Sequence, residues 1–366
     1  MKVLVTAKWR AFTNALAPVA RELIDRSHDV EIIATGNEHE AKGFEGLDYE
    51  HTTSIGSLVP LLKDKDLLIT GLSGQYLPDA QFIRAINAMR KPSIGIMDQN
   101  GYYSERINQG ALPTVIGLVS QMSVPRFLQE LGQQGKDLMH RLVVVGWPGL
   151  DHYAGIPASF PEEEREQLRE SLGIEGKCHL HLTQNIHPDT DYMRDVDRPY
   201  HVKLQNFLDE MNLTTNVLET AKNMGLRVVV KPYPGEGSTL NYTEGIALRL
   251  GHLYVPAHAC NTQKLMLASH SISAGKSHAL NEGCLLDINT VGFLPGCSQE
   301  DLDSLPAISN NAIPYTTKGA DIPDLLEHIT SQDLQTREEL QSKRRNFLVD
   351  GQGAKRVADY AERLTS

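Results

Sequence analysis

Long apolar runs are missing from this sequence of 366 residues. The first apolar run, at residues 3–6, is soon interrupted by Lys8, Trp9 and Arg10, so it is too short for the core of a signal peptide. No later stretch reaches the roughly 18 consecutive apolar residues of a membrane-spanning helix. The sequence therefore predicts a soluble protein without an integral membrane segment.

Closely spaced cysteines are also missing. The four cysteines, Cys178, Cys260, Cys284 and Cys297, form no C-x-x-C pair. This spacing argues against a disulfide framework and against a zinc knuckle. It is typical of a protein of the reducing cytoplasm, which is the location that we expect.

Basic side chains are fewer than acidic ones. The chain has 46 Asp and Glu against 35 Lys and Arg, which gives a formal net charge of -11. Such a charge disfavours a general attraction to nucleic acid or anionic lipid, so no nucleic-acid partner is predicted, although a local basic pocket is compatible with it. The hydrophobic content of 40% is that of a globular protein, and the length suggests two domains.

Strand and helix patterns alternate through the first half of the chain. Short β-branched runs predict strands at residues 1–5, 28–36, 66–71, 92–98 and 141–146. Apolar residues spaced as in a helix separate these runs, at residues 15–23 and 79–89. Repeated strand and helix segments predict a parallel sheet with helices on both faces.

The second half repeats this alternation after a proline-containing linker at residues 149–160. We expect helices at 161–172 and 202–224 and from about 277, and strands at 178–182, 226–231, 253–255 and 272–273. The predicted fold class is therefore α/β, with two Rossmann-like, doubly wound parallel-sheet domains. We place them at residues 1–155 and 156–345, followed by a C-terminal helix at 346–366.

One turn between a predicted strand and a predicted helix carries Gly275, Lys276, Ser277 and His278. Main-chain N–H groups at the start of a helix lack partners within the helix and suit a phosphate or diphosphate. Glu282 follows within reach of ribose hydroxyls. The alternative is that Ser277 only caps the helix and Glu282 is solvated. A Walker A loop is excluded, because His270 stands where its first glycine is required.

Other polar residues follow the predicted strands, where open α/β sheets bind ligands. Lys231 ends a buried strand and could neutralise phosphate, or could simply extend its ammonium to solvent. Asp98 is the candidate carboxylate base, or the cap of the next turn. Further candidates for the ligand crevice follow two other strands, namely Lys8, Arg10, Thr13, Thr183, Asn185 and His187.

Metal binding is not expected. His179 and His181 alternate along one predicted strand, which is compatible with a zinc site. However, no cysteine or second carboxylate stands at a tight spacing with them. We therefore predict no metal ligands and no cofactor.

Five segments, in order, resemble motifs of the GT-B nucleotide-sugar glycosyltransferases, a superfamily that also contains the UDP-N-acetylglucosamine 2-epimerases. Residues 144–151 (VVGWPGLD) resemble V-x-G-N-P-x-x-D, residues 231–234 (KPYP) resemble K-P-H-P, and residues 275–282 (GKSHALNE) resemble G-G-S-T-x-x-x-E. Residues 164–174 and 347–354 resemble the helix that opens the second domain and the closing helix. Trp147, Tyr233, Lys276 and His278 depart from these motifs.

The resemblance implies two domains facing a cleft, with the acceptor on the N-terminal side, the nucleotide-sugar on the C-terminal side and a final helix that crosses back. It implies transfer of a sugar from a nucleotide-diphosphate donor, with UDP expected first, to a hydroxyl acceptor, in the manner of polysaccharide biosynthesis. A nucleotide-sugar epimerase or hydrolase, a CDP-activated glycerophosphate or sugar transferase and a non-catalytic binding protein stay open as alternatives. The oligomeric state, the sugar, the acceptor and the stereochemical outcome are also left open.

Overall fold

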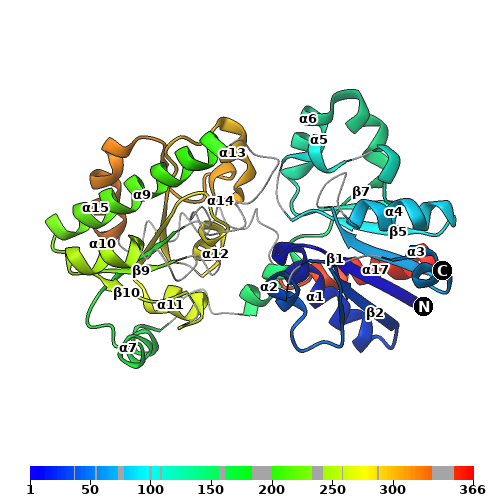
Figure 1. Cartoon of the computed structure of the whole chain (residues 1–366), viewed down its shortest axis with the longest axis horizontal. Coiled ribbons are helices and arrows are strands. Elements are labelled where there is room, and N and C mark those ends of the chain that lie inside the picture. Colours follow the sequence, from blue (N-terminus) through cyan, green and yellow to red (C-terminus); the bar gives the residue numbers. More distant parts are fainter. Residues whose placement is uncertain are drawn as a thin grey trace. The chain divides into compact units, whose positions relative to one another are not determined.

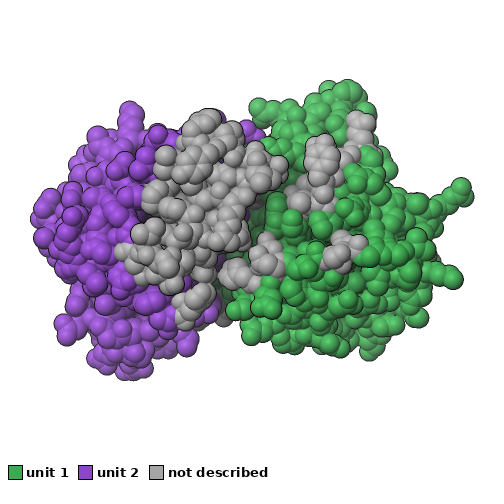
Figure 2. Space-filling view, viewed as in Figure 1, with its two compact units in different colours: residues 1–155, 345–366 green, residues 156–344 purple. Residues whose placement is uncertain are grey.

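The chain divides into two compact units in a computed structural model, one of residues 1–155 with 345–366 and the other of residues 156–344 (Figure 2). The model describes residues 1–36, 38–53, 56–72, 78–98, 101–107, 109–155, 161–183, 200–232, 242–257, 259–286, 288–331 and 350–366. Among these residues, no helix has both the length and the apolar character needed to cross a bilayer.

The first unit is built on a parallel sheet with the order β3-β2-β1-β4-β5-β6-β7. Strands β1, β2, β5 and β7 of this sheet are labelled in Figure 1. Its strands are β1 (Lys2–Ala7), β2 (Asp29–Ala34), β3 (Glu50–His51), β4 (Leu67–Gly71), β5 (Ser93–Ile96), β6 (Val115–Leu118) and β7 (Leu142–Val144). The helices are α1 (Arg10–Asp25), α2 (Glu38–Ala41), α3 (Leu58–Lys63), α4 (Pro78–Ala88), α5 (Tyr103–Arg106), α6 (Ser123–Leu138) and α17 (Gly353–Thr365). Short 3-10 helices lie at Lys42–Phe44, Gln109–Ala111, Met139–Arg141 and Pro148–Gly155.

Two apolar layers cover this sheet because its central strands bury side chains on both faces. Every residue of β4 is buried, as are all residues of β1 after the first. One face packs on α1 and α17, and the other on α4, α5 and α6. The β-branched runs seen in the sequence therefore become strands buried on both faces.

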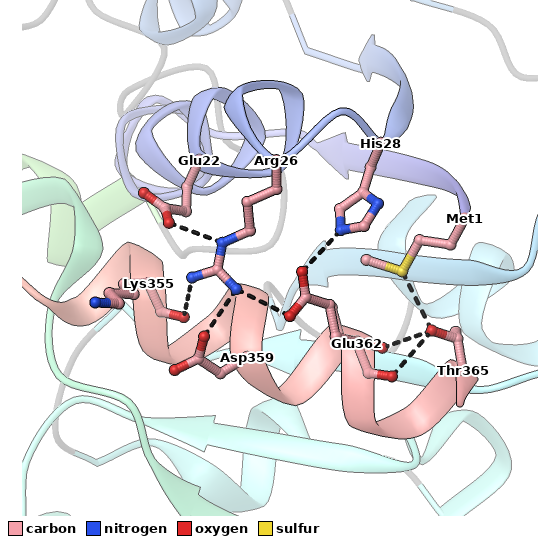
Figure 3. Close-up of polar contacts among 9 residues, drawn as sticks. Met1, Glu22, Arg26, His28, Lys355, Asp359, Glu362 and Thr365 are labelled. Carbon is pink, nitrogen blue, oxygen red and sulfur yellow. Dashed lines mark hydrogen bonds and ion pairs between the residues drawn. The ribbon is translucent and has the colours of Figure 1, made fainter.

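The C-terminal helix α17 is fixed to the first unit by polar contacts at both of its ends. At its start, the Asp151 carboxylate accepts hydrogen bonds from the Gly353 and Ala354 amides at 3.0 and 2.8 Å. Further along, Arg26 at the end of α1 donates to Asp359 and Glu362 at 2.8 and 3.1 Å (Figure 3). The last residue of the 144–151 motif thus acts as the cap of α17.

The second unit has a parallel sheet with the order β10-β9-β8-β11-β12-β13. Its strands are β8 (His179–Leu182), β9 (Val228–Lys231), β10 (Leu253–Tyr254), β11 (Ser271–Ala274), β12 (Asn289–Phe293) and β13 (Tyr315–Thr316). Its helices are α7 (Glu162–Ser171), α9 (Tyr200–Asn223), α10 (Tyr242–Leu250), α11 (Thr262–Ala268), α12 (Ala279–Leu285), α13 (Gln299–Ser304), α14 (Pro306–Ser309) and α15 (Ile322–Ser331), with a 3-10 turn at Gly319–Asp321.

Helices pack on both faces of this second sheet as well. Helices α9, α10 and α15 share an apolar cluster with β9 and β12 on one face. On the other face α12 approaches closely at Gly283, where a Cβ atom would lie 2.5 Å from the Thr290 hydroxyl oxygen. The predicted α/β fold class with two doubly wound parallel sheets is confirmed.

Each sheet reverses its strand order beside its first strand. In the first unit the chain runs outward from β1 through β2 to β3 and then returns to β4 on the other side of β1. In the second unit it runs from β8 through β9 to β10 and returns to β11 on the other side of β8. Open α/β sheets bind ligands beyond the carboxyl ends of the strands at such switch points. Each unit therefore has one preferred edge for a ligand.

Candidate functional site

Three of the predicted site residues lie on neighbouring strand ends at the switch point of the second unit. Leu182 of β8 pairs with Lys231 of β9 on one side and with Ala274 of β11 on the other. The residues that follow, Thr183 and Gly275, therefore leave the sheet at the same edge. Thr183 also donates its main-chain N–H to the Lys231 carbonyl at 3.2 Å. The structure thus brings Lys231, Thr183 and Gly275 together.

Lys231 ends β9 as a buried cation. Its residue is only 2% exposed, and its ammonium donates a hydrogen bond to the Ala257 carbonyl at 2.6 Å. Burial lowers the pKa of this ammonium, while nearby Cys260 acts in the opposite direction. A buried ammonium hydrogen-bonded to a neutral carbonyl gains from an anionic ligand, because charge pairs are stronger away from water.

The turn from Gly275 to His278 has local partners of its own. The Ser277 amide donates to the Gly275 carbonyl at 2.8 Å, and the Ser277 hydroxyl accepts from the Ala279 amide at 3.2 Å. The N-cap position of α12 is held by His278, and the Ser277 hydroxyl contacts the first amide of the helix. His278 lies 3.3 Å from the Asn281 amide nitrogen, which orients its ring, and Glu282 is half-buried in the first turn of α12.

Lys276 forms an ion pair that the sequence reasoning missed. Its ammonium contacts the Asp301 carboxylate in the first turn of α13. Asp301 also accepts from the Ser298 amide and hydroxyl at 2.9 and 2.8 Å, completing a capping box. The Ser-x-x-Asp spacing at 298–301 is the sequence signal that could have located the start of α13, although not the contact with Lys276.

The histidines of β8 are bound by hydroxyl groups. His179 lies 2.8 Å from the Ser271 hydroxyl and 2.7 Å from the Ser273 hydroxyl. His181 lies 2.8 Å from the same Ser273 hydroxyl and 3.3 Å from that of Thr214 on α9. Burial lowers the pKa of His179 to about 3 and that of His181 to about 4, so both rings are neutral at pH 7. Among the described residues, no group of three or more His, Cys, Asp or Glu could hold a metal ion.

The turn after β1 presents two half-buried cations and one buried hydroxyl. Lys8 places its ammonium 5.9 Å from the centre of the Trp9 ring, and Trp9 stacks on Phe12 at 6.4 Å. Thr13 is fully buried, and its hydroxyl donates to the Arg10 carbonyl at 3.1 Å. Lys8 and Arg10 are half-buried and stay candidates for ligand contact, whereas the Thr13 hydroxyl has a structural partner.

Asp98 follows β5 and is paired with a cation. Its carboxylate contacts the Arg106 guanidinium, and its residue is only 6% exposed. Arg106 also donates to the Leu72 carbonyl at 3.3 Å and lies 5.7 Å from the centre of the Phe12 ring. The role of Asp98 as a base stays a prediction, as does the role of Asn185 and His187, which lie outside the described residues.

Comparisons with known proteins place this architecture in one fold. No protein-family model and no curated protein matches the chain. Solved structures that match include a putative UDP-N-acetylglucosamine 2-epimerase from Listeria monocytogenes, with 12% identity, a TM-score of 0.65 and coverage of 99% of this chain and 96% of that one. A glycosyltransferase from Rickettsia africae has 11% identity and a TM-score of 0.63, covering 99% and 98%.

A third match is the UDP-GlcNAc 2-epimerase of Methanocaldococcus jannaschii, in complex with UDP-GlcNAc and UDP. It has 13% identity and a TM-score of 0.62, covering 99% of this chain and 100% of that one. At these identities the likeness concerns the fold. Together with the two doubly wound units, it shows that the chain has the GT-B fold of nucleotide-sugar glycosyltransferases and UDP-N-acetylglucosamine 2-epimerases.

Proposed function

We propose that the chain is a glycosyltransferase that moves a sugar from a UDP-linked donor to a hydroxyl acceptor without a divalent metal. The observation that carries the proposal is the row of strand ends at the switch point of the second unit, where Lys231, Thr183 and Gly275 leave the sheet together. This is the edge at which Rossmann-like sheets hold nucleotides. The matching structures include glycosyltransferases and one protein solved with UDP-GlcNAc and UDP.

Negative charge builds up on the diphosphate as the glycosidic bond breaks. In the proposal, Lys231 and the main-chain amides of the Gly275 turn stabilise this charge. Lys231 suits the role because it is buried and fixed at the end of β9, so little reorganisation is required during the reaction. Glu282, in the first turn of α12, would accept hydrogen bonds from the ribose hydroxyls.

Deprotonation of the acceptor is assigned to Asp98. Arg106 fixes the position of this carboxylate, and Asp98 would orient the acceptor hydroxyl and take its proton as the sugar is transferred. The cations of the first unit, Lys8 and Arg10, are proposed to contact the acceptor or the donor phosphate.

The experiment that tests the nucleotide site is calorimetric titration of UDP, CDP, GDP and ADP into wild-type protein and Glu282→Ala. A hydrogen bond to a charged group contributes about 1.5 to 3 kcal/mol, so Glu282→Ala should weaken UDP binding by about one to two orders of magnitude. Glu175→Ala is the matched control, because its side chain is 92% exposed, and should bind as wild type does. Equal affinity of the Glu282 variant and wild type would remove Glu282 from the site.

An epimerase is the second candidate, since two of the matching structures are epimerases. Incubation with UDP-GlcNAc in the absence of any acceptor separates the candidates. A transferase leaves most of the donor intact, an epimerase yields the 2-epimer, and a hydrolase releases UDP and free sugar. A CDP-activated transferase would bind CDP most tightly, and nucleotide binding without any turnover would indicate a non-catalytic protein.

A further inference from the structure

Lys276 lies beside the proposed nucleotide site, and its ammonium is engaged in an ion pair with Asp301. Lys276 is two residues beyond Ala274, the last residue of β11, and its side chain is 38% exposed. Its partner on α13 is 23% exposed. A pair this open to water contributes little to stability, so a ligand with more negative charge can compete for the lysine.

The two partners differ in how firmly they are held. The second carboxylate oxygen of Asp301 accepts hydrogen bonds from both the amide and the hydroxyl of Ser298, and the carboxylate lies in the first turn of α13. These contacts hold the Asp301 carboxylate in place even without the lysine. The Lys276 side chain is long and flexible, so it can leave while Asp301 stays in place.

A second carboxylate, Glu210, lies near the pair, as their shared effect on the Cys297 thiol shows. Burial together with Asp301 and Glu210 raises the pKa of the Cys297 thiol to about 11, whereas Lys276 acts in the opposite direction. The three charged groups therefore lie near the same thiol. With Lys276 held among carboxylates, the positive charge available to an incoming diphosphate is reduced.

We propose that Asp301 lowers the affinity of the site for nucleotide diphosphates by holding Lys276, and that binding transfers the lysine from Asp301 to the ligand's phosphate. This deepens the proposed function and rests on it. The exchange replaces one carboxylate contact with contact to a more highly charged diphosphate, and leaves the capping box of α13 intact. Asp301 is thus a tuning residue that acts through Lys276.

A double-mutant cycle measured by calorimetry with UDP tests the exchange. Asp301→Asn should tighten UDP binding by about two- to fivefold, because the energy of one partly exposed pair is no longer lost on binding. Lys276→Met should weaken binding by about tenfold. The lost contact with phosphate outweighs the small gain from an ion pair that no longer has to be broken. In the Lys276→Met background, Asp301→Asn should have no effect on affinity.

Two further variants separate this exchange from a general charge effect and from misfolding. Asp303→Asn removes the same charge from the same helix and should leave UDP affinity unchanged. Asp301→Glu keeps the charge and should restore the wild-type value. Thermal unfolding of each variant, followed by circular dichroism, checks that α13 and the unit around it remain folded.

The outcomes distinguish the two proposals. Two results would overturn the exchange and leave the nucleotide site in place. In one, the protein binds UDP but the effects of the Lys276 and Asp301 substitutions on affinity are additive. In the other, folded Asp301→Asn binds UDP more weakly than wild type does. If the wild-type protein binds none of the four nucleotides, the proposed function fails and the exchange fails with it.

Discussion

The two units share a sheet topology but fill the centre of the sheet differently. In the first unit, β1 and β4 are almost wholly apolar, with a single buried polar pair in which Thr6 donates to Thr70 at 2.8 Å. In the second unit, β8 and β11 carry Ser271, His179, Ser273 and His181, which form a side-chain hydrogen-bond chain that ends at Thr214 of α9. The same strand order therefore does not require the same interior.

The difference teaches that a polar centre is tolerated only when every member has a partner. Each neutral imidazole has one donor and one acceptor, and each hydroxyl has one donor. Ser273 can donate to only one of the two histidine nitrogens that it contacts, so the other must carry a proton and donate to it. The tautomers of His179 and His181 are therefore coupled, whereas the Thr6–Thr70 pair has no such constraint.

Acid should have the largest effect and should destabilise the second unit before the first, because the buried histidines of the second unit are neutral when folded. The folded pKa values of His179 and His181 are about 3 and 4, below 6.5 in the unfolded chain. Between these values the unfolded chain binds protons that the folded chain does not, so stability is complete above pH 6.5 and falls as the pH drops. From pH 7 to 5 the loss is about 4 kcal/mol.

Burial also lowers the pKa values of His252 and His270 in the second unit. Among the described histidines of the first unit, burial lowers the pKa of His152 alone. Both tryptophans, Trp9 and Trp147, belong to the first unit, so their fluorescence reports on that unit alone. In an acid titration, circular dichroism should change while tryptophan fluorescence is still native. Coincident transitions, or loss of fluorescence first, would contradict this.

Removing the shared hydroxyl should have the next largest effect. Ser273→Ala leaves one nitrogen of His179 and one of His181 without their partner in a buried place, which costs about 3 kcal/mol in the free energy of unfolding. Ser269→Ala is the matched control. The Ser269 hydroxyl is equally buried, but it donates to the Leu265 main-chain carbonyl and not to a histidine of β8. Denaturant unfolding followed by circular dichroism gives the free energy of unfolding of both variants. An equal loss of free energy would show that the hydroxyl shared by His179 and His181 contributes no more than an ordinary buried hydroxyl.

Strand and helix positions followed from local pattern, since β4, β8 and β9 lie within the runs expected at 66–71, 178–182 and 226–231. Strands β3, β6, β12 and β13 were missed. Gly117 interrupts the apolar run of β6, and Asn289, Thr290 and Gly292 weaken the apolar signal of β12. Strands β3 and β13 have only two residues each.

The contacts of the candidate site depend on residues that are distant in the sequence. Lys276 and Asp301 are 25 positions apart, and His181 and Thr214 are 33 apart. No local period brings such pairs together, because they meet only through the order of the strands and the packing of α9 and α13. The sequence could therefore indicate Gly275 to Glu282 as a ligand turn, but not that Asp301 holds its lysine.

The smallest effect is expected in the first unit, at the Thr6–Thr70 pair, where the Thr70 hydroxyl also donates to the Gly71 carbonyl at 3.5 Å. Thr70→Val keeps the shape of the side chain but removes the acceptor of the Thr6 hydroxyl, which should cost about 1 kcal/mol in unfolding free energy. Replacing both partners, with Thr6→Val added, leaves neither hydroxyl unpaired and should return the stability close to that of wild type. Denaturant unfolding followed by tryptophan fluorescence measures both variants in this unit. A double variant less stable than Thr70→Val would mean that the Thr6 hydroxyl has a contact other than Thr70. The recovery has no counterpart at Ser273, because one oxygen there serves two imidazoles, and no single apolar replacement can satisfy both.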